Sequence, residues 1–162
     1  MHRRRPRTTV RRASRALAVL VLSTILLSTI AGFALARTYR GRLLHSIDIS
    51  RRNHDVRPVR LNVRLSQDAL QHTRMMIRSN RLYDVRNLYD VLAPYDWSRF
   101  GGAVVGCATK LRAVHRAFMH HAEHRKIILN PSARRVGIGV IRMDGRSSCG
   151  TDAFWVTEIF YG

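Results

Sequence analysis

The sequence contains few lysines and few acidic residues. Of its 162 residues, 29 are lysine or arginine and 10 are aspartate or glutamate, which gives a formal net charge of +19. Such a charge favours nucleic acid, anionic lipid or an acidic wall polymer as partner. The two lysines are Lys110 and Lys126, and the arginines are scattered through every segment rather than gathered on one helix face. This scatter indicates a generally basic, solvated surface instead.

Cysteine is equally scarce. Cys107 and Cys149 are the two cysteines of the chain, and no Cys-x-x-Cys spacing supports redox catalysis. In an oxidising compartment a lone pair usually forms one disulfide, and a bridge across the long loop between them would contribute roughly 3–4 kcal/mol. Two free thiols or a pair of metal ligands are the alternatives.

The first 36 residues have the composition of a targeting segment. Residues 2–15 carry seven arginines and no acid, and the uncharged run 16–36 ends in Ala34-Leu35-Ala36, which resembles a signal peptidase site. The run is also long enough to cross a bilayer as an uncleaved anchor. Both alternatives place the rest of the chain outside, because the arginines stay on the cytoplasmic side. The chain would be secreted, or anchored at the cell surface by residues 16–36, and only this segment would contact the membrane. Because an exported chain does not meet nucleic acid, we expect no nucleic-acid partner.

The first half of the remaining chain has helical patterns. Residues 37–45 are predicted to be a basic tether, and a short helix from Ser46 towards His54 is ended by Pro58. A second helix is predicted with Ser66 as its N-cap. The apolar stripe of that helix consists of Ala69, Leu70, Thr73, Met76 and Ile77.

From Asn80 to Gly102 the pattern is irregular and rich in aromatic residues, which we expect to pack a long loop onto the body. These aromatic residues are Tyr83, Tyr89, Tyr95, Trp97 and Phe100.

The second half of the chain contains the strand patterns. A short extended piece is predicted at 103–105, followed by a helix capped by Thr109 and ended before Pro131, with an apolar inner face formed by Leu111, Val114, Ala117 and Phe118. The alternation of 136–141 predicts a strand, and a loop containing Cys149 leads into a final strand over 153–161. Helices early and strands late indicate an α+β domain.

Three histidines are close together in His120-His121-Ala122-Glu123-His124. On a continuous helix His120 and His124 would share a face, and two imidazoles at this spacing can reach one metal ion. The order differs from His-Glu-x-x-His, and a third ligand would have to come from elsewhere. The alternative is a helix end with exposed imidazoles, which the helix dipole favours.

Several C-terminal motifs resemble those of one family. From Val114 the chain reads V-H-R-A-F-M-H-H-A-E-H-R-K-I-I-L-N-P, then R-R-V-G-I-G-V, and it closes on W-V-T-E-I-F-Y-G. The His-Arg pair, the I-L-N-P stop, the G-x-G strand and the final W-V-T-x-x-F strand resemble the end of a CAP domain. This is the superfamily of SCP-like, cysteine-rich secretory, antigen 5 and pathogenesis-related-1 proteins, here in a compact bacterial form. The resemblance covers roughly Ser46 to Gly162 and implies a three-layered α-β-α sandwich.

The resemblance also implies a cleft with two histidines and two acidic residues, a tetrad associated with divalent metal. His124, followed by Arg125, matches the second family histidine, whereas Asp84 stands in place of the first. Ala103 occupies the position of the glutamate in the family's G-E-N-V-G run, and His120 or His121 lies near the remaining acidic position. Since alanine can neither hold a metal nor polarise water, this tetrad is degenerate.

We therefore expect an exported, non-catalytic CAP domain. The cleft bordered by Tyr83–Phe100 and His120–His124 would bind a small hydrophobic or anionic ligand, a lipid, a wall component or a protein. One alternative is a divalent-metal-dependent hydrolase in which Asp84, His124 and a second histidine hold zinc or calcium. Another is a membrane-tethered structural or interaction protein whose basic surface contacts anionic lipid or wall polymer.

Overall fold

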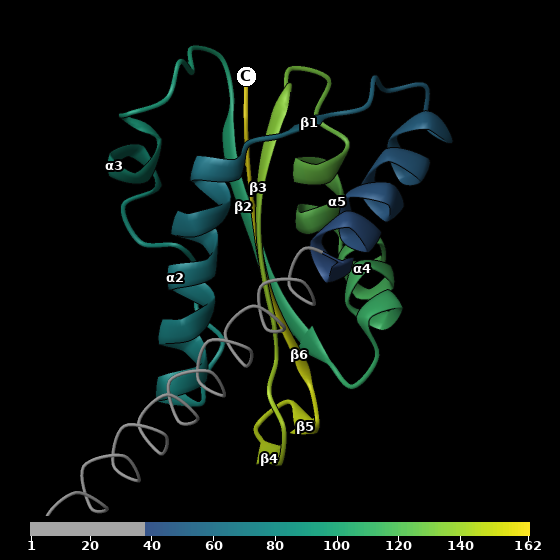
Figure 1. The fold of residues 1–162 in the computed structure, drawn as a ribbon. Coiled ribbons are helices and arrows are strands. Elements are labelled where there is room, and N and C mark those ends of the chain that lie inside the picture. The colour runs from purple at the N-terminus through teal and green to yellow at the C-terminus, as the bar shows by residue number, and fades with distance from the viewer. Residues whose placement is uncertain (1–37) are drawn as a thin grey trace, which may run out of the picture. The chain divides into compact units, whose positions relative to one another are not determined.

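A four-stranded sheet forms the middle layer of residues 38–162, the part of the chain that the computed structural model describes (Figure 1). α2 (Val63–Ser79) and α3 (Leu88–Leu92) cover one face of the sheet. A first helix over 38–52, α4 (Leu111–His120) and α5 (Ala122–Ile128) cover the other face. The expected three-layered α-β-α sandwich is thus confirmed.

The predicted signal peptide or anchor, residues 1–36, lies outside the described residues. Between residues 38 and 162, no helix has both the length and the apolar character needed to cross a bilayer.

β6 (Phe154–Tyr161) is the central strand of the sheet. It pairs antiparallel with both β2 (Gly101–Ala108) and β3 (Arg135–Arg142), and β1 (Arg60–Leu61) adds to β3 in parallel. All of β6 is buried, and its side chains alternate between the two helical layers. The sheet thus gives each layer its own core. The strands predicted at 103–105, 136–141 and 153–161 are confirmed, the first as part of a longer strand.

The predicted tether at 37–45 is wrong for every residue described, because 38–52 form one continuous helix. Leu43 and Ile47 are buried in the core, and Tyr39 packs edge-on against Phe154 with ring centroids 5.0 Å apart. The guanidinium group of Arg51, fully buried, donates hydrogen bonds to four backbone carbonyls, those of Arg57, Ile128, Asn130 and Ala133. These bonds connect the helix to the end of the α5 region.

α2 begins earlier than predicted. Its N-cap is Asn62, whose side chain accepts a hydrogen bond from the backbone N–H of Leu65 at 3.0 Å. The predicted cap, Ser66, is buried, and its hydroxyl accepts from the N–H of Ile138 at 3.1 Å. The predicted stripe is confirmed, with four of its residues buried and Ile77 partly buried. A Cβ at Gly139 would lie 2.3 Å from the Ala69 backbone, so glycine in β3 allows α2 to approach the sheet.

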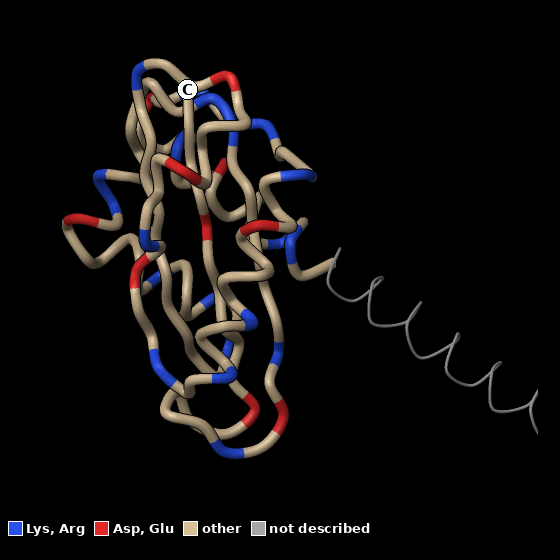
Figure 2. Tube along the Cα trace, turned by 90° about the vertical axis from the view of Figure 1, so that its left-hand side faces the viewer, with Lys and Arg blue, Asp and Glu red and all other residues tan. Residues whose placement is uncertain are grey.

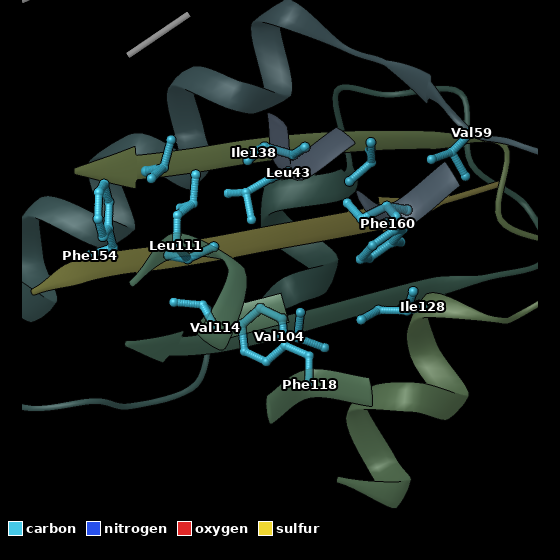
Figure 3. Close-up of a cluster of buried hydrophobic side chains, with 14 of the residues drawn as sticks. Leu43, Val59, Val104, Leu111, Val114, Phe118, Ile128, Ile138, Phe154 and Phe160 are labelled. Atoms are coloured by element: carbon cyan, nitrogen blue, oxygen red, sulfur yellow. The ribbon is translucent and has the colours of Figure 1, made fainter. Parts of the chain in front are cut away.

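α4 packs its apolar face onto the opposite side of the sheet (Figure 3). Leu111, Val114 and Phe118 are buried as predicted, whereas Ala117 is exposed. The predicted cap Thr109 is wrong, because the N-cap is Lys110 and no side chain caps this helix. Nearly all of this core consists of aliphatic and aromatic side chains. The lysines and arginines are spread along the whole described chain (Figure 2).

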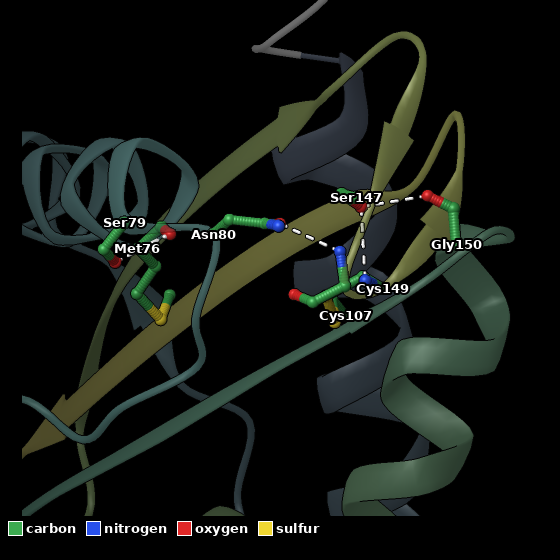
Figure 4. Close-up of a disulfide and its surroundings, with 8 residues drawn as sticks. Met76, Ser79, Asn80, Cys107, Ser147, Cys149 and Gly150 are labelled. Carbon is green, nitrogen blue, oxygen red and sulfur yellow. Dashed lines mark hydrogen bonds between the residues drawn. A yellow bond between two sulfur atoms is a disulfide. The ribbon is translucent and has the colours of Figure 1, made fainter.

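A disulfide joins Cys107 at the end of β2 to Cys149, with Cα atoms 5.8 Å apart (Figure 4). Cys149 lies in the turn between β4 (Arg146–Ser147) and β5 (Gly150–Thr151). Asn80, the C-cap of α2, accepts a hydrogen bond from the N–H of Ser148 at 2.8 Å. The predicted disulfide is confirmed, and it holds the β4–β5 hairpin against the α2 side of the domain.

Candidate functional site

The histidine cluster lies where the helix predicted to be continuous is broken. His121 has an extended backbone, φ −84° and ψ 121°, and separates α4 from α5. The break removes the i, i+4 relation predicted for His120 and His124. Instead the rings of His121 and His124 lie 4.6 Å apart, and His124 also packs edge-on against Phe118 at 5.3 Å. The structure therefore pairs His124 with His121 and leaves His120 exposed at the end of α4.

Asp84 lies close enough to His124 to act on it electrostatically. Burial lowers the pKa of the His124 imidazole, the neighbouring His121 lowers it further, and the Asp84 carboxylate opposes both effects. Nowhere in residues 38–162 do three histidine, cysteine or acidic side chains converge in an arrangement that could hold a metal ion. His121, His124 and Asp84 are therefore neighbours, but within residues 38–162 their side chains do not converge as the ligands of one metal ion would.

A cavity of about 730 Å³ lies on the other side of the sheet, between α2 and the segment 81–95. Its floor includes Ile159 of β6, and its wall on α2 is a helical stripe formed by Arg64, Asp68, Gln71, His72, Met75 and Ser79. The opposite wall is formed by Arg81, Tyr83, Val85, Arg86, Asp90, Val91, Pro94 and Tyr95. The predicted cleft is therefore bordered by the expected aromatic segment, but its second border is α2 and not the histidine cluster.

His72 is the most buried polar side chain of the cavity wall, with 5% of its surface exposed. Its Nδ1 lies 3.2 Å from the hydroxyl of Thr157, which also receives a hydrogen bond from Thr73 at 2.9 Å. The ring packs edge-on against Tyr83, with centroids 5.1 Å apart. Its Nε2 is buried and has no hydrogen-bond partner among the described residues. Burial lowers the pKa of His72, against an opposing effect of Asp84, so the imidazole is neutral at pH 7.

A second polar group stands at the other end of the cavity. The hydroxyl of Tyr95 donates a 2.5 Å hydrogen bond to the Asp68 carboxylate, and the Arg64 guanidinium lies 5.5 Å from the centre of the Tyr95 ring. Burial, followed by the hydrogen bond to Asp68, raises the pKa of Tyr95. Tyr95 therefore stays protonated and holds Asp68 in place.

The family model for CAP, the cysteine-rich secretory protein family, matches residues 37–160. The chain belongs to the CAP family. The match begins at residue 37, in agreement with a domain that includes the helix over 38–52. No curated protein matches the sequence.

Solved structures agree with this CAP assignment. An extracellular protein of Bacillus anthracis with an SCP domain is 17% identical with a TM-score of 0.59, and the match covers 80% of this chain and 42% of that protein. An outer surface protein of Borrelia burgdorferi is 9% identical with a TM-score of 0.58, over 77% of this chain and 94% of that one. A cysteine-rich secretory protein of Staphylococcus aureus is 16% identical with a TM-score of 0.53, over 75% and 38%.

These likenesses show the fold alone, because the identities are low. This chain spans less than half the length of the Bacillus and Staphylococcus proteins.

The degenerate CAP tetrad is distributed over both faces of β2. Ala103 lies opposite Ile159 and packs with the cluster of Leu65 and Ala69, on the α2 side. His124 packs against Phe118, which belongs to the core on the other side. Ala103 provides no polar atom between the two groups.

Sequence reasoning missed two buried polar side chains of this CAP domain. His72 lies beside the predicted apolar stripe of α2, next to Thr73, and is buried with it. Glu158 stands on β6 between Val104 and Ile138, is fully buried, and neither carboxylate oxygen has a hydrogen-bond partner within residues 38–162. Burial raises the pKa of Glu158 to about 8, so the carboxyl group is protonated at neutral pH.

Proposed function

We propose that this CAP domain is an exported binding module that takes a small ligand in the cavity beside α2 and does not catalyse a reaction. The observation that carries the proposal is the cavity of about 730 Å³, whose lining combines apolar side chains with the exposed arginines Arg81 and Arg86. Ligand pockets typically enclose about 300–1,000 Å³ and combine an apolar lining with a few fixed polar groups. The apolar Met75, Val85 and Ile159 and the polar His72 supply such a lining.

Export is supported by two observations. Cys107 and Cys149 form a disulfide, which persists in oxidising compartments outside the cytoplasm. The solved structures with the same fold include an extracellular and an outer surface protein. An N-terminal segment that is cleaved, or that anchors the chain by residues 16–36, accounts for how it would be exported.

Binding rather than catalysis is supported by the position of Ala103. A glutamate-dependent mechanism needs a carboxylate at that point to move a proton or hold a metal, and alanine provides neither. His72 has a neutral imidazole whose Nδ1 contacts the hydroxyl of Thr157. Asp84 influences the pKa of His72 through its backbone and its charge, and not through a side-chain hydrogen bond. In the cavity Asp68 is bonded to Tyr95, and His72 is bonded to Thr157 and to no carboxylate side chain that could orient it as a general base.

The test is to expose residues 37–162 to a lipid extract and to a wall fraction, and to identify retained molecules by native mass spectrometry. Met75, 41% exposed on the cavity wall, is replaced by tryptophan to fill the cavity. The matched control is Ile49→Trp, because Ile49 is 40% exposed on the opposite helical layer. We expect a retained ligand that Met75→Trp abolishes and Ile49→Trp preserves. Absence of any retained molecule, or equal retention in both variants, would contradict the proposal.

A metal-dependent hydrolase with an altered ligand set is the second candidate. It is favoured by the ring contact of His121 with His124 and by the influence of Asp84 on the pKa of His124. A calorimetric zinc titration of the oxidised domain, with His124→Ala as control, tests it. Saturable binding of one zinc ion that is lost in His124→Ala would support this candidate, and its absence would leave the binding module.

A further inference from the structure

The cavity follows α2 over most of the length of the helix. Arg64 and Ser79 are the outermost cavity residues on α2, and at 1.5 Å per residue their positions lie about 22 Å apart along the axis. The segment 81–95 runs back along the same helix, because Arg81 follows its C-terminal end and Tyr95 reaches Asp68 near its beginning. An elongated molecule fits this shape better than a round one.

The charges of the cavity are distributed unevenly along it. At one end the Arg64 guanidinium lies over Tyr95, beside the Asp68 carboxylate that Tyr95 holds. Arg81, which follows the C-terminal end of α2, and Arg86 of the returning segment also line the cavity, and neither takes part in an ion pair within residues 38–162. Asp90 is the second acidic residue of the lining. Arg81 and Arg86 therefore offer two guanidinium groups without a bound carboxylate.

Apolar side chains form part of the lining, namely Met75 of α2, Val91 of α3 and Ile159 of β6. Met75 is 41% exposed. Burial of such a surface by a hydrocarbon chain is favourable in proportion to the apolar area removed from water.

From these features we propose that the ligand is an elongated anionic amphiphile. Its carboxylate or phosphate group binds Arg81 and Arg86, and its apolar body lies along Met75, Val91 and Ile159. This inference rests on the proposed function and adds the chemical class of the ligand. Guanidinium groups favour such anions because they offer charge-assisted hydrogen bonds in a planar fork.

Decanoate, decanol and vesicles of phosphatidylglycerol are suitable probes for residues 37–162. Decanoate and decanol have the same hydrocarbon body and differ in charge, so the ratio of their dissociation constants isolates the anionic contribution. Calorimetry at low salt is expected to give at least about tenfold tighter binding for decanoate, which corresponds to one charge-assisted contact. Retention of the domain by the vesicles, with weak decanoate binding, would identify a lipid headgroup as the source of the same anion.

Single substitutions test the contacts. Arg81→Ala and Arg86→Ala are each expected to weaken decanoate binding about tenfold and to leave decanol binding unchanged. Arg116→Ala is the matched control, since Arg116 is exposed on α4 in the opposite layer and its loss changes the net charge equally.

The outcomes separate this inference from the proposed function. Equal affinity for decanoate and decanol, with no effect of Arg81→Ala or Arg86→Ala, would overturn the anionic class while the cavity remained a binding site. An equal loss in Arg116→Ala would also overturn it, because only the overall charge would then matter. Failure of all probes, together with no molecule retained from the extracts, would remove the proposed function itself.

Discussion

Thr157 and Glu158 are neighbours on β6, and they point to opposite faces of the sheet. On the α2 face, Thr157 is bonded to His72 and Thr73 beside a cavity. On the other face, Glu158 has no hydrogen-bond partner among the described residues and is surrounded by a close-packed apolar core. The two faces of β6 therefore border helical layers that are stabilised in different ways. The α2 face, the linked face, has polar and covalent links around a space, whereas the other, the packed face, is mainly apolar and has the hydrogen bonds of Arg51 at its end.

The largest expected effect on stability comes from the ionisation of Glu158, which is buried in the packed face. Its pKa is 4.5 in an unfolded chain and about 8 when folded, so the native state retains a proton that the unfolded state releases between these values. The carboxyl group's stabilising effect is therefore full below pH 4.5 and is lost as the pH rises to about 8. The loss amounts to about 5 kcal/mol in the free energy of unfolding.

Glu158→Gln isolates this effect, because glutamine stays neutral at every pH. Urea unfolding between pH 5 and 9 should show stability falling with pH in the wild type relative to Glu158→Gln. The stability of the wild type must be compared with that of Glu158→Gln at each pH, because two buried histidines also titrate. Burial lowers the pKa of His72 and of His115, so these residues make the fold more stable as the pH rises towards the ordinary histidine pKa, which opposes the effect of Glu158. Parallel curves for the two proteins would show that Glu158 is solvated or paired in solution.

The next largest effect comes from the disulfide on the linked face. Replacing Cys107 and Cys149 by alanine should lower the free energy of unfolding by about 3–4 kcal/mol, because the bridge closes a loop with a sequence separation of 42. Thermal melts with and without reductant check this. The wild type should respond to reductant, and the double variant should not. Similar melting of the oxidised and reduced wild type would mean that the hydrogen bonds of the β4–β5 hairpin alone hold this side.

The two faces also differ in how far the sequence predicted them. The alternation at Val136, Ile138 and Val140 predicted β3 because a strand buried between layers needs apolar residues at that period. The helix over 38–52 was predicted only from Ser46 onward, and its first half was taken for a tether, because arginines surround the buried Leu43 and Ile47 and conceal their four-residue spacing. Local patterns therefore predicted the strands and failed where charge and burial share one helix.

The candidate site was less predictable than the fold. The aromatic segment from Tyr83 was expected to border the cleft, and it does. The other wall of the cavity is α2. This wall depends on the segment 81–95 returning along the helix, and no local sequence pattern predicts that contact. Helix N-caps failed for a similar reason: Asn62 and Ser66 both have capping side chains, and only tertiary contact with Ile138 decides their roles.

The smallest expected effect on stability comes from Thr157, the hydrogen-bonded residue of the Thr157–Glu158 pair. Thr157→Val keeps the shape of the side chain but removes the hydroxyl that contacts both His72 and Thr73. Leaving a buried imidazole nitrogen without a partner costs about 1–3 kcal/mol, so the variant should lose stability by that amount with little dependence on pH above 7. Glu158→Gln should instead gain stability there.

Urea unfolding of Thr157→Val and Glu158→Gln at pH 7.5, measured side by side, gives the comparison directly. Opposite signs would establish that the polar residue on the α2 face stabilises the fold through its partners, while its neighbour on β6 destabilises it through burial alone. A loss of stability in both variants would mean that Glu158 has a partner in solution, and the packed face would then resemble the linked one.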